Sequence, residues 1–329
     1  MQRDIVFIFT IVLALLFNFL DGYVASSSLV ATIIGSRALG PRQALLLASV
    51  SEFIGPLLFG AAVAGTIGRD FVETSELTLI TVLAMLIGAV VWLLVTYRLG
   101  LPVSPSHSLV GGIIGATVAA SGWEAIHPAG LIKIVTSLIA APMVGLISGW
   151  FFMHLVLFLA RGASPRISRS FSRAQIATST LLALSQGSND AQKTMGVIMM
   201  ALVITGGEAD FRIPVWVLLA CAITIALGVA SGGSRTIRTL ASKFFHVRLV
   251  HGFATQTVAA TVVLLAGILG APVSASQVVS SALVGVGVAE RLSKIRWEVF
   301  TNILLAWVLT IPAAGFVAAA AYVLLSRFA

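Results

Sequence analysis

The chain has 329 residues, of which 58% are hydrophobic and 10% are charged, and its mean hydropathy is +1.06. This composition excludes a soluble enzyme or binding domain and indicates a polytopic membrane protein. The net charge of +8 does not call for a nucleic-acid partner, because cytoplasmic loops rich in Arg and Lys account for such an excess.

Ten apolar segments follow one another along the chain and predict an all-α membrane protein. They cover residues 5–36, 44–66, 77–97, 104–121, 131–160, 176–206, 213–231, 251–269, 273–289 and 297–325. The first lacks a convincing signal-peptide cleavage site, so it is predicted to stay as a span. Several segments exceed the ~20 residues that a span needs, so we expect ten to twelve elements, some of them broken or re-entrant.

The charged loops predict the orientation in the cell membrane. Residues 161–175, 234–248 and 291–296 carry Arg and Lys without any acid, so they are predicted to be cytoplasmic. The acids gather instead in residues 68–76, at Glu124 and in residues 208–210, which are predicted to lie outside. Ten crossings then place both the N-terminus and the C-terminus outside.

The sequence repeats itself with a shift of 165 to 170 residues. Residues 101–116 (LPVSPSHSLVGGIIGA) align with residues 271–286 (APVSASQVVSSALVGV), and the same shift pairs Pro142 with Pro312. The predicted crossings of the two copies run in opposite directions, as in many secondary transporters. We therefore expect two inverted repeats, one in each half of the chain. Their predicted boundaries are residues 1–160, a basic linker of residues 161–175, and residues 176–329.

The stretch from Gly187 to Thr194 (GSNDAQKT) is strongly polar within an apolar segment. Such groups are costly in hydrocarbon and normally face a ligand or a water-filled cavity. Gly187 is predicted to break the helix and expose backbone groups; the alternative is a short polar loop between two helices. Asp190 suits a sodium ion or a proton. Lys193 is predicted to pair with Asp190, to face an anion or to extend toward the membrane interface.

Two Pro-Val-Ser motifs predict an anion site. Serine is a good N-cap and proline suits the first turn, so two helix starts, one from each half, would aim N–H groups and hydroxyls at a shared centre. Ordinary capping is the alternative. The predicted substrate-binding residues are Ser104, Ser106, Ser188, Asn189, Asp190, Gln192, Lys193, Thr194, Ser274 and Ser276.

Further polar and small residues lie inside the apolar segments. Glu52 is an intramembrane acid and therefore a functional candidate. His107 has either a proton-carrying role or a hydrogen-bonded packing role. The Gly-xxx-Gly spacings that start at Gly111, Gly145 and Gly228 permit close contacts between helices.

These motifs resemble the inorganic phosphate transporter (PiT) family. The resemblance rests on GSNDAQKTMGVI (187–198), GSRALGPRQALLLASVSEFIG (35–55), LPVSPSHSLVGGIIGA (101–116), SRTIRTL (234–240) and NILLAWVLTIPA (302–313). It implies a homodimeric symporter that imports orthophosphate with sodium or protons and needs no resident cofactor or metal. It also implies that Asn189 and Asp190 belong to the substrate and cation site, and that Glu52 matches a functional glutamate of the family.

The first half departs from the family pattern. Where the family has an Asn-Asp pair, this chain has Val24 and Ala25, and Gln256 and Gln277 replace a family Glu and His. Asp21, about one helical turn away, is predicted to substitute in part as a cation ligand. The other candidates are Ser26, Ser27, Ser28, Gln256 and Gln277.

Two alternatives to phosphate import follow from these departures. One is a permease for sulfate or another oxyanion, and the other is a regulatory paralogue that does not transport. A membrane enzyme is not expected, because the chain has no HExxH, G-x-S-x-G or nucleotide-binding motif.

Overall fold

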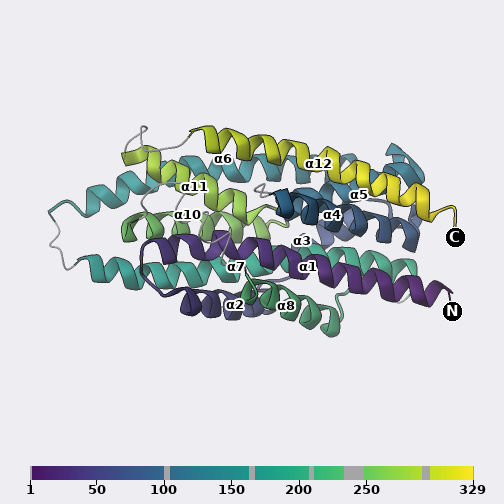
Figure 1. Ribbon diagram of the computed structural model, residues 1–329, viewed down its shortest axis with the longest axis horizontal. Coiled ribbons are helices and arrows are strands. Elements are labelled where there is room, and N and C mark those ends of the chain that lie inside the picture. The colour runs from purple at the N-terminus through teal and green to yellow at the C-terminus, as the bar shows by residue number, and fades with distance from the viewer. Residues whose placement is uncertain are drawn as a thin grey trace.

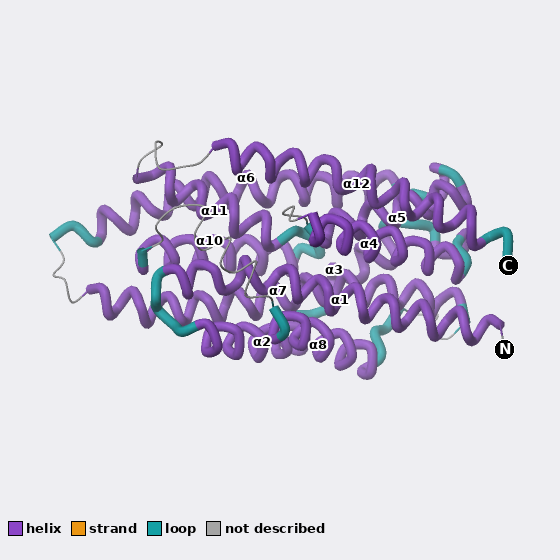
Figure 2. Tube along the Cα trace, in the orientation of Figure 1, coloured by secondary structure: helices purple, strands orange, loops and turns teal. Residues whose placement is uncertain are grey.

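The chain folds into a bundle of helices. The computed structural model describes residues 2–99, 104–162, 167–206, 211–232, 248–290 and 297–328, and Figure 2 draws them as helices and loops. The helices are α1 (Gln2–Gly35), α2 (Pro41–Leu58), α3 (Ala62–Gly65), α4 (Leu79–Leu99), α5 (Pro105–Ser121), α6 (Pro128–Leu159), α7 (Ile167–Ile204), α8 (Val215–Ala230), α10 (Leu249–Ile268), α11 (Ala275–Glu290) and α12 (Trp297–Leu325).

Helix length and composition confirm an all-helical membrane protein. In the described residues, five helices (α1, α4, α6, α10 and α12) are long and apolar enough to cross a bilayer by themselves. A sixth span arises if α2 and the short helices after it, Ala62–Asp70, form one element bent by 71°. Helices α8 and α11 are apolar but shorter. Each of the predicted segments coincides with a helix or with this bent pair.

The predicted helix break at Gly187 is wrong, because α7 is continuous from Ile167 to Ile204. Gly187 serves a close helix crossing instead: a Cβ there would lie 2.6 Å from the backbone oxygen of Glu52 on α2. The actual break lies between α2 and α3, and α7 stabilises it. Ser188 and Gln192 donate hydrogen bonds to the carbonyl oxygen of Phe59, and the Gln192 side-chain oxygen accepts one from the N–H of Val63. These bonds satisfy backbone groups that the break sets free.

Helix pairing follows the sequence repeat. Helix α1 packs on α8 as α7 packs on α2, and α5 packs on α12 as α11 packs on α6. In Figure 1, α1 runs from right to left and α7 from left to right, and α6 and α12 are likewise antiparallel. This is the arrangement expected of inverted repeats. Helix α7 already begins at Ile167, inside the stretch predicted as a linker; the division of the chain into domains remains a prediction.

Glycines permit the close contacts between these helices. A Cβ at Gly115 would overlap the carbonyl oxygen of Gly315, and one at Gly149 would lie 2.5 Å from that of Ala282. One at Gly228 would overlap the carbonyl oxygen of Phe19. The three Gly-xxx-Gly spacings therefore bring helices of one chain together, as their sequence predicts.

The two ends of the bundle differ. Both termini lie at one end, and the end of α6 and the start of α7 lie at the other (Figure 1). Two loops predicted to be external contact each other, since the Glu73 N–H bonds to the carbonyl of Ala125 at 2.9 Å. The membrane side of each end remains a prediction. Residues 101–103, 208–210, 234–247 and 291–296, on which several sequence predictions fall, lie outside the described residues.

Candidate functional site

The predicted site residues lie inside the bundle. Asp190 is 3% exposed, Lys193 is 1% exposed and Glu52 is fully buried. The other predicted residues are also buried, apart from the half-buried Ser276. The structure is therefore a state in which these side chains are closed off from bulk water.

Lys193 joins three parts of the chain. Its ammonium donates to Asp190 Oδ1 at 2.5 Å, to Ser106 Oγ at 2.5 Å and to the carbonyl oxygen of Val273 at 3.2 Å. Lys193 thus pairs with Asp190, one of the three predicted alternatives, and does not extend to the membrane interface. The pair balances two charges that would each be costly to bury alone.

The starts of α5 and α11 meet beside Lys193. Ser104 caps α5 by accepting a hydrogen bond from the His107 N–H at 3.3 Å, and Ser106 Oγ donates to the carbonyl oxygen of Val273 at 3.1 Å. His107 Nδ1 lies 2.8 Å from Ser104 Oγ and 3.3 Å from the Gln277 amide. His107 and Gln277 occupy equivalent positions of the two repeats, 170 residues apart. The predicted convergence of the two helix starts is therefore seen in the structure.

Asn189 holds the segment before α11. Its amide donates to the carbonyl oxygen of Ala271 at 3.2 Å, and its side-chain oxygen accepts from the N–H of Val273 at 3.3 Å. Asn189, Ser188 and Gln192 are therefore all bonded to backbone groups of neighbouring segments. In this state these three side chains hold neighbouring backbone segments, whereas Lys193 bonds to the side chains of Asp190 and Ser106.

Two further acids, Glu52 and Asp21, and one amide lie near the Lys193–Asp190 pair. Glu52 on α2 is near enough to Asp190 and Asp21 for their charges to repel one another. Both carboxylate oxygens of Glu52 and Oδ2 of Asp21 are buried without a hydrogen-bond partner among the described residues. Buried oxygens of this kind are unfavourable unless a cation or proton compensates them. The described residues contain no group of three His, Cys, Asp or Glu side chains close enough to hold a metal ion by themselves.

Gln186 belongs to this cluster and was not among the predicted residues. It interacts with Asp190, yet its amide atoms make no hydrogen bond of good geometry in the described part of the chain. The repeat holds the signal that identifies it, because a shift of 165 residues places Gln186 on Asp21.

Other candidates have polar groups bonded elsewhere. The hydroxyls of Ser26, Ser27 and Ser28 donate to carbonyl oxygens of their own helix, at 2.7, 3.0 and 2.8 Å. The Gln256 amide donates to Thr32 Oγ1 at 2.8 Å, and its side-chain oxygen lies 3.5 Å from Thr178 Oγ1. Ser274 Oγ lies 3.2 Å from Ser276 Oγ. None of these contacts involves Lys193 or the three acids.

Comparisons with known proteins match nearly the whole chain. Residues 23–165 and 159–318 each match the model of the phosphate transporter family, so each half matches it separately. The chain is 36% identical to a probable low-affinity inorganic phosphate transporter of Bacillus subtilis, covering 98% of this chain and 99% of that protein. It is 30% identical to a putative phosphate permease of Pyrococcus furiosus, covering 97% and 96%.

A solved structure has the same fold. It is described as the sodium-dependent phosphate transporter, is 27% identical, and superposes with a TM-score of 0.87 over 98% of this chain and 100% of that chain. These relatives are transporters, in agreement with the expectation that the chain is not an enzyme. Both the sequence motifs and the fold lead to one assignment: the chain belongs to the phosphate transporter family.

Proposed function

We propose that this chain is a secondary transporter that imports inorganic phosphate across the cell membrane in symport with sodium. Membership of the family and the names of its relatives support the substrate and the ion. The observation that carries the proposal is the buried Lys193 ammonium, which joins the starts of α5 and α11 beside Asp190.

Phosphate binds where the two helix starts meet. N–H groups at a helix start and serine hydroxyls donate hydrogen bonds to an anion, and the helix dipole favours negative charge there. Ser104, Ser106, Ser274 and Ser276 bring such donors from both repeats, and Lys193 adds a positive charge. The ammonium is a compact charge with three donors, so it is suited to a phosphate oxygen.

Sodium acts at the acids and changes what Lys193 does. In the closed state Asp190 holds Lys193 at 2.5 Å. A sodium ion bound next to Asp190 takes over part of the charge of Asp190, which weakens its hold on the ammonium. Lys193 is then free to turn toward phosphate. The anion and the cation thus favour each other's binding, which is the thermodynamic basis of symport.

The orientation and assembly are parts of the same proposal. Both termini lie outside the cell, and the protein is a homodimer. Maleimide labelling of a cysteine added at either end tests the orientation, because the native Cys221 is buried. Native mass spectrometry tests the assembly: a monomer, or a terminal cysteine labelled from the cytoplasmic side alone, contradicts the respective part.

Uptake of labelled phosphate and labelled sulfate into proteoliposomes tests the function, with a sodium gradient or a proton gradient imposed. We expect phosphate uptake driven by sodium and lost in Asp190→Asn. Sulfate uptake alone would change the substrate, and uptake driven by protons alone would change the ion. Uptake of neither anion by folded protein would favour the non-transporting alternative.

A further inference from the structure

Residues 270–273, between α10 and α11, are held by side chains of four other elements, namely α5, α6, α7 and the short helix Thr66–Asp70. Each of their carbonyl oxygens accepts a hydrogen bond from a side chain: Gly270 from Thr66 at 2.6 Å, Ala271 from Asn189 at 3.2 Å, Pro272 from Ser137 at 3.0 Å, and Val273 from Ser106 at 3.1 Å and Lys193 at 3.2 Å. This connecting segment therefore joins the Lys193 centre to a second group of polar side chains near Gly270.

Lys133 of α6 lies at the Gly270 end of this segment. Its ammonium donates to Thr66 Oγ1 at 2.9 Å, and the same hydroxyl donates to the carbonyl oxygen of Gly270. Gly270 has a φ of 66°, and a Cβ there would lie 3.2 Å from the Lys133 nitrogen. A glycine thus lets the backbone bend and the ammonium approach it. Lys133 and Lys193 are therefore at opposite ends of one four-residue segment.

Lys133 is a half-buried cation without an ion-pair partner in the part of the chain that the structure describes. Lys193, by contrast, is paired with Asp190. An ammonium has three N–H donors, and the described residues accept a hydrogen bond from one of those of Lys133, at Thr66. An ionisable residue in a long apolar helix such as α6 is costly and normally marks a ligand or an ion pathway. The charge of Lys133 therefore favours an anion as its partner.

The repeat shows that the fold does not require this charge. The shift of 170 residues that pairs Pro142 with Pro312 also pairs Lys133 with Ile303, its mate on α12. The bond that holds Gly270 is made by the hydroxyl of Thr66, so a neutral donor at position 133 would serve the segment as well. A role in packing therefore accounts for a polar group at Lys133 but not for a positive one.

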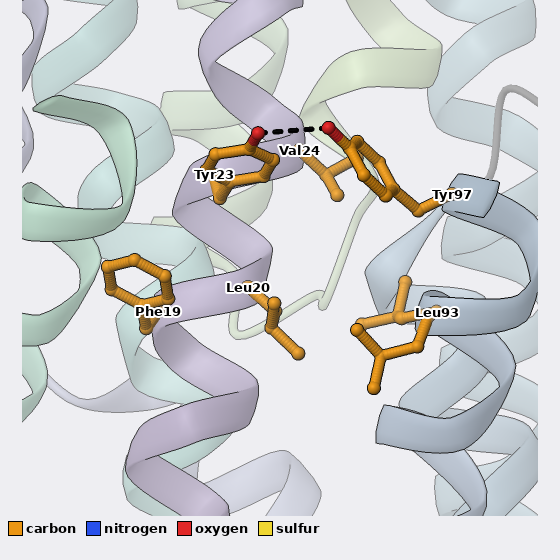
Figure 3. Close-up of a pocket in the computed structure, with 7 residues that line it drawn as sticks. Phe19, Leu20, Tyr23, Val24, Leu93 and Tyr97 are labelled. Carbon is orange, nitrogen blue, oxygen red and sulfur yellow. Dashed lines mark hydrogen bonds between the residues drawn. The ribbon is translucent and has the colours of Figure 1, made fainter. Parts of the chain in front are cut away.

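The cavity between α1 and α4 offers an anion nothing comparable. It has a volume of about 160 Å³, and the side chains that line it are apolar except for the hydroxyls of Tyr23 and Tyr97. These hydroxyls bond to each other at 2.9 Å (Figure 3), and tyrosine is neutral at physiological pH. Lys133, rather than this cavity, is therefore the place for a second anion contact.

We propose that Lys133 forms a second phosphate contact, at the opposite end of the 270–273 segment from Lys193 and on the entry side of the central site. The proposal rests on the proposed function for its anion and its direction of transport. In that orientation Lys133 lies nearer the outside, since Gly130, three residues earlier in α6, packs against the backbone of Asp70 in a loop predicted to be external. The ammonium attracts the anion and donates to its oxygens through N–H groups that no described residue accepts.

Phosphate uptake into proteoliposomes by charge variants of the full chain is the first measurement. Lys133→Gln removes the charge and keeps a donor for Thr66, whereas Lys133→Arg keeps the charge. We expect Lys133→Gln to raise the KM for phosphate by about 10-fold or more, because a hydrogen bond to a charged group is lost, with the maximal rate within about twofold of wild type. Lys133→Arg is expected to stay within about threefold of the wild-type KM, because it keeps the positive charge. An unchanged KM in Lys133→Gln would overturn the proposal.

Ser137→Ala is the matched control for a role in holding the segment. Ser137 also lies on α6 and bonds to the same segment, at Pro272, without a charge. We expect Ser137→Ala to keep the wild-type KM, and thermal unfolding in detergent checks that each variant is folded. Equal rises of the KM in Ser137→Ala and Lys133→Gln would show that Lys133 acts through the segment, and would overturn the proposal.

Protection of the native lysines from acetylation tests the contact without any substitution. The chain has four lysines, Lys133, Lys193, Lys243 and Lys294. The purified full chain is treated briefly with acetic anhydride in sodium phosphate or in sodium chloride of equal ionic strength, and each site is quantified by mass spectrometry. We expect phosphate well above its Kd to slow acetylation of Lys133 by about threefold or more, relative to Lys243 and Lys294. Equal acetylation of Lys133 in the two salts would overturn the proposal.

These outcomes are distinguishable from failure of the proposed function. Protection of Lys133 by phosphate, without phosphate uptake by the folded protein, removes the function and keeps the contact. Sodium-driven phosphate uptake with a wild-type KM in Lys133→Gln, and without protection of Lys133, keeps the function and removes the contact.

Discussion

Helices α1 and α7 are equivalent in the repeat, and they share geometry but not chemistry. Each is continuous and crosses a partner helix at a glycine, Gly22 in one and Gly187 in the other. Next to that crossing, α7 has Asp190 and Lys193, where α1 has Ala25 and Ser28. The crossing needs only the absence of a Cβ, so the fold is kept whatever chemistry the following residues have.

The starts of α5 and α11, unlike α1 and α7, have the same polar residues at equivalent positions. Ser104 and Ser106 of α5 have equivalents in Ser274 and Ser276 before and within α11. The donors for an anion therefore come from both repeats. The buried charged groups also come from both, Asp21 and Glu52 from the first and Asp190 and Lys193 from the second, but not from equivalent positions.

Removing the charge of Asp190 is expected to have the largest effect on uptake, and it tests the chemical difference between α7 and α1 directly. Asp190→Asn leaves the Lys193 ammonium buried without a carboxylate, a change that costs about 3–5 kcal/mol in buried pairs. We expect sodium-driven phosphate uptake to fall by at least about 100-fold. The equivalent substitution, Ala25→Ser, is expected to keep uptake. Equal losses in the two variants would show that the charge of Asp190 is not what distinguishes α7 from α1.

Adding a methyl group at the two crossings tests their shared geometry. Gly187→Ala and Gly22→Ala each place a Cβ against the backbone of the partner helix, and overpacking of this kind costs about 1–3 kcal/mol. We expect both variants to unfold at lower temperature in detergent, by similar amounts. Gly60→Ala is the control, because a Cβ there meets nothing within 4 Å in the described structure. A stable Gly22→Ala would show that the α1–α8 crossing is looser than the structure has it.

Hydropathy predicted the helices well, because long apolar segments have few alternatives in a bilayer. The buried polar residues were equally conspicuous, since hydrocarbon makes such groups rare. The position of the helix break was not predictable in this way. Gly187 permits a break or a close crossing, and the partner helix decides between them. The true break depends on Ser188 and Gln192, which lie about 130 residues away from it in sequence.

Ser106→Ala tests the anion side with a smaller change. It removes one hydroxyl that contacts the Lys193 ammonium, and a hydrogen bond to a charged group contributes about 1.5–3 kcal/mol. We expect the KM for phosphate to rise by about 10-fold or more while the sodium concentration for half-maximal uptake changes little. A change confined to the sodium dependence would assign Ser106 to the cation site instead.

Of these variants, His107→Gln is expected to change uptake least. It places a glutamine at both equivalent positions of the two helix starts, as Gln277 already does in the second repeat. His107 contacts Ser104 and the amide of Gln277, its repeat mate, and a glutamine offers both a donor and an acceptor for the same partners. If His107 has the packing role, uptake stays within about threefold of wild type, a smaller change than the loss of one hydrogen bond would cause. The pH dependence of uptake between about 5.5 and 8, roughly the range in which histidine titrates, is then unchanged. If His107 carries a proton, uptake by the variant loses its pH dependence. The two helix starts would then differ in function, because His107 titrates and Gln277 does not. Measuring uptake against pH for the wild type and for His107→Gln side by side separates these outcomes, because the substitution leaves the Lys193–Asp190 pair intact.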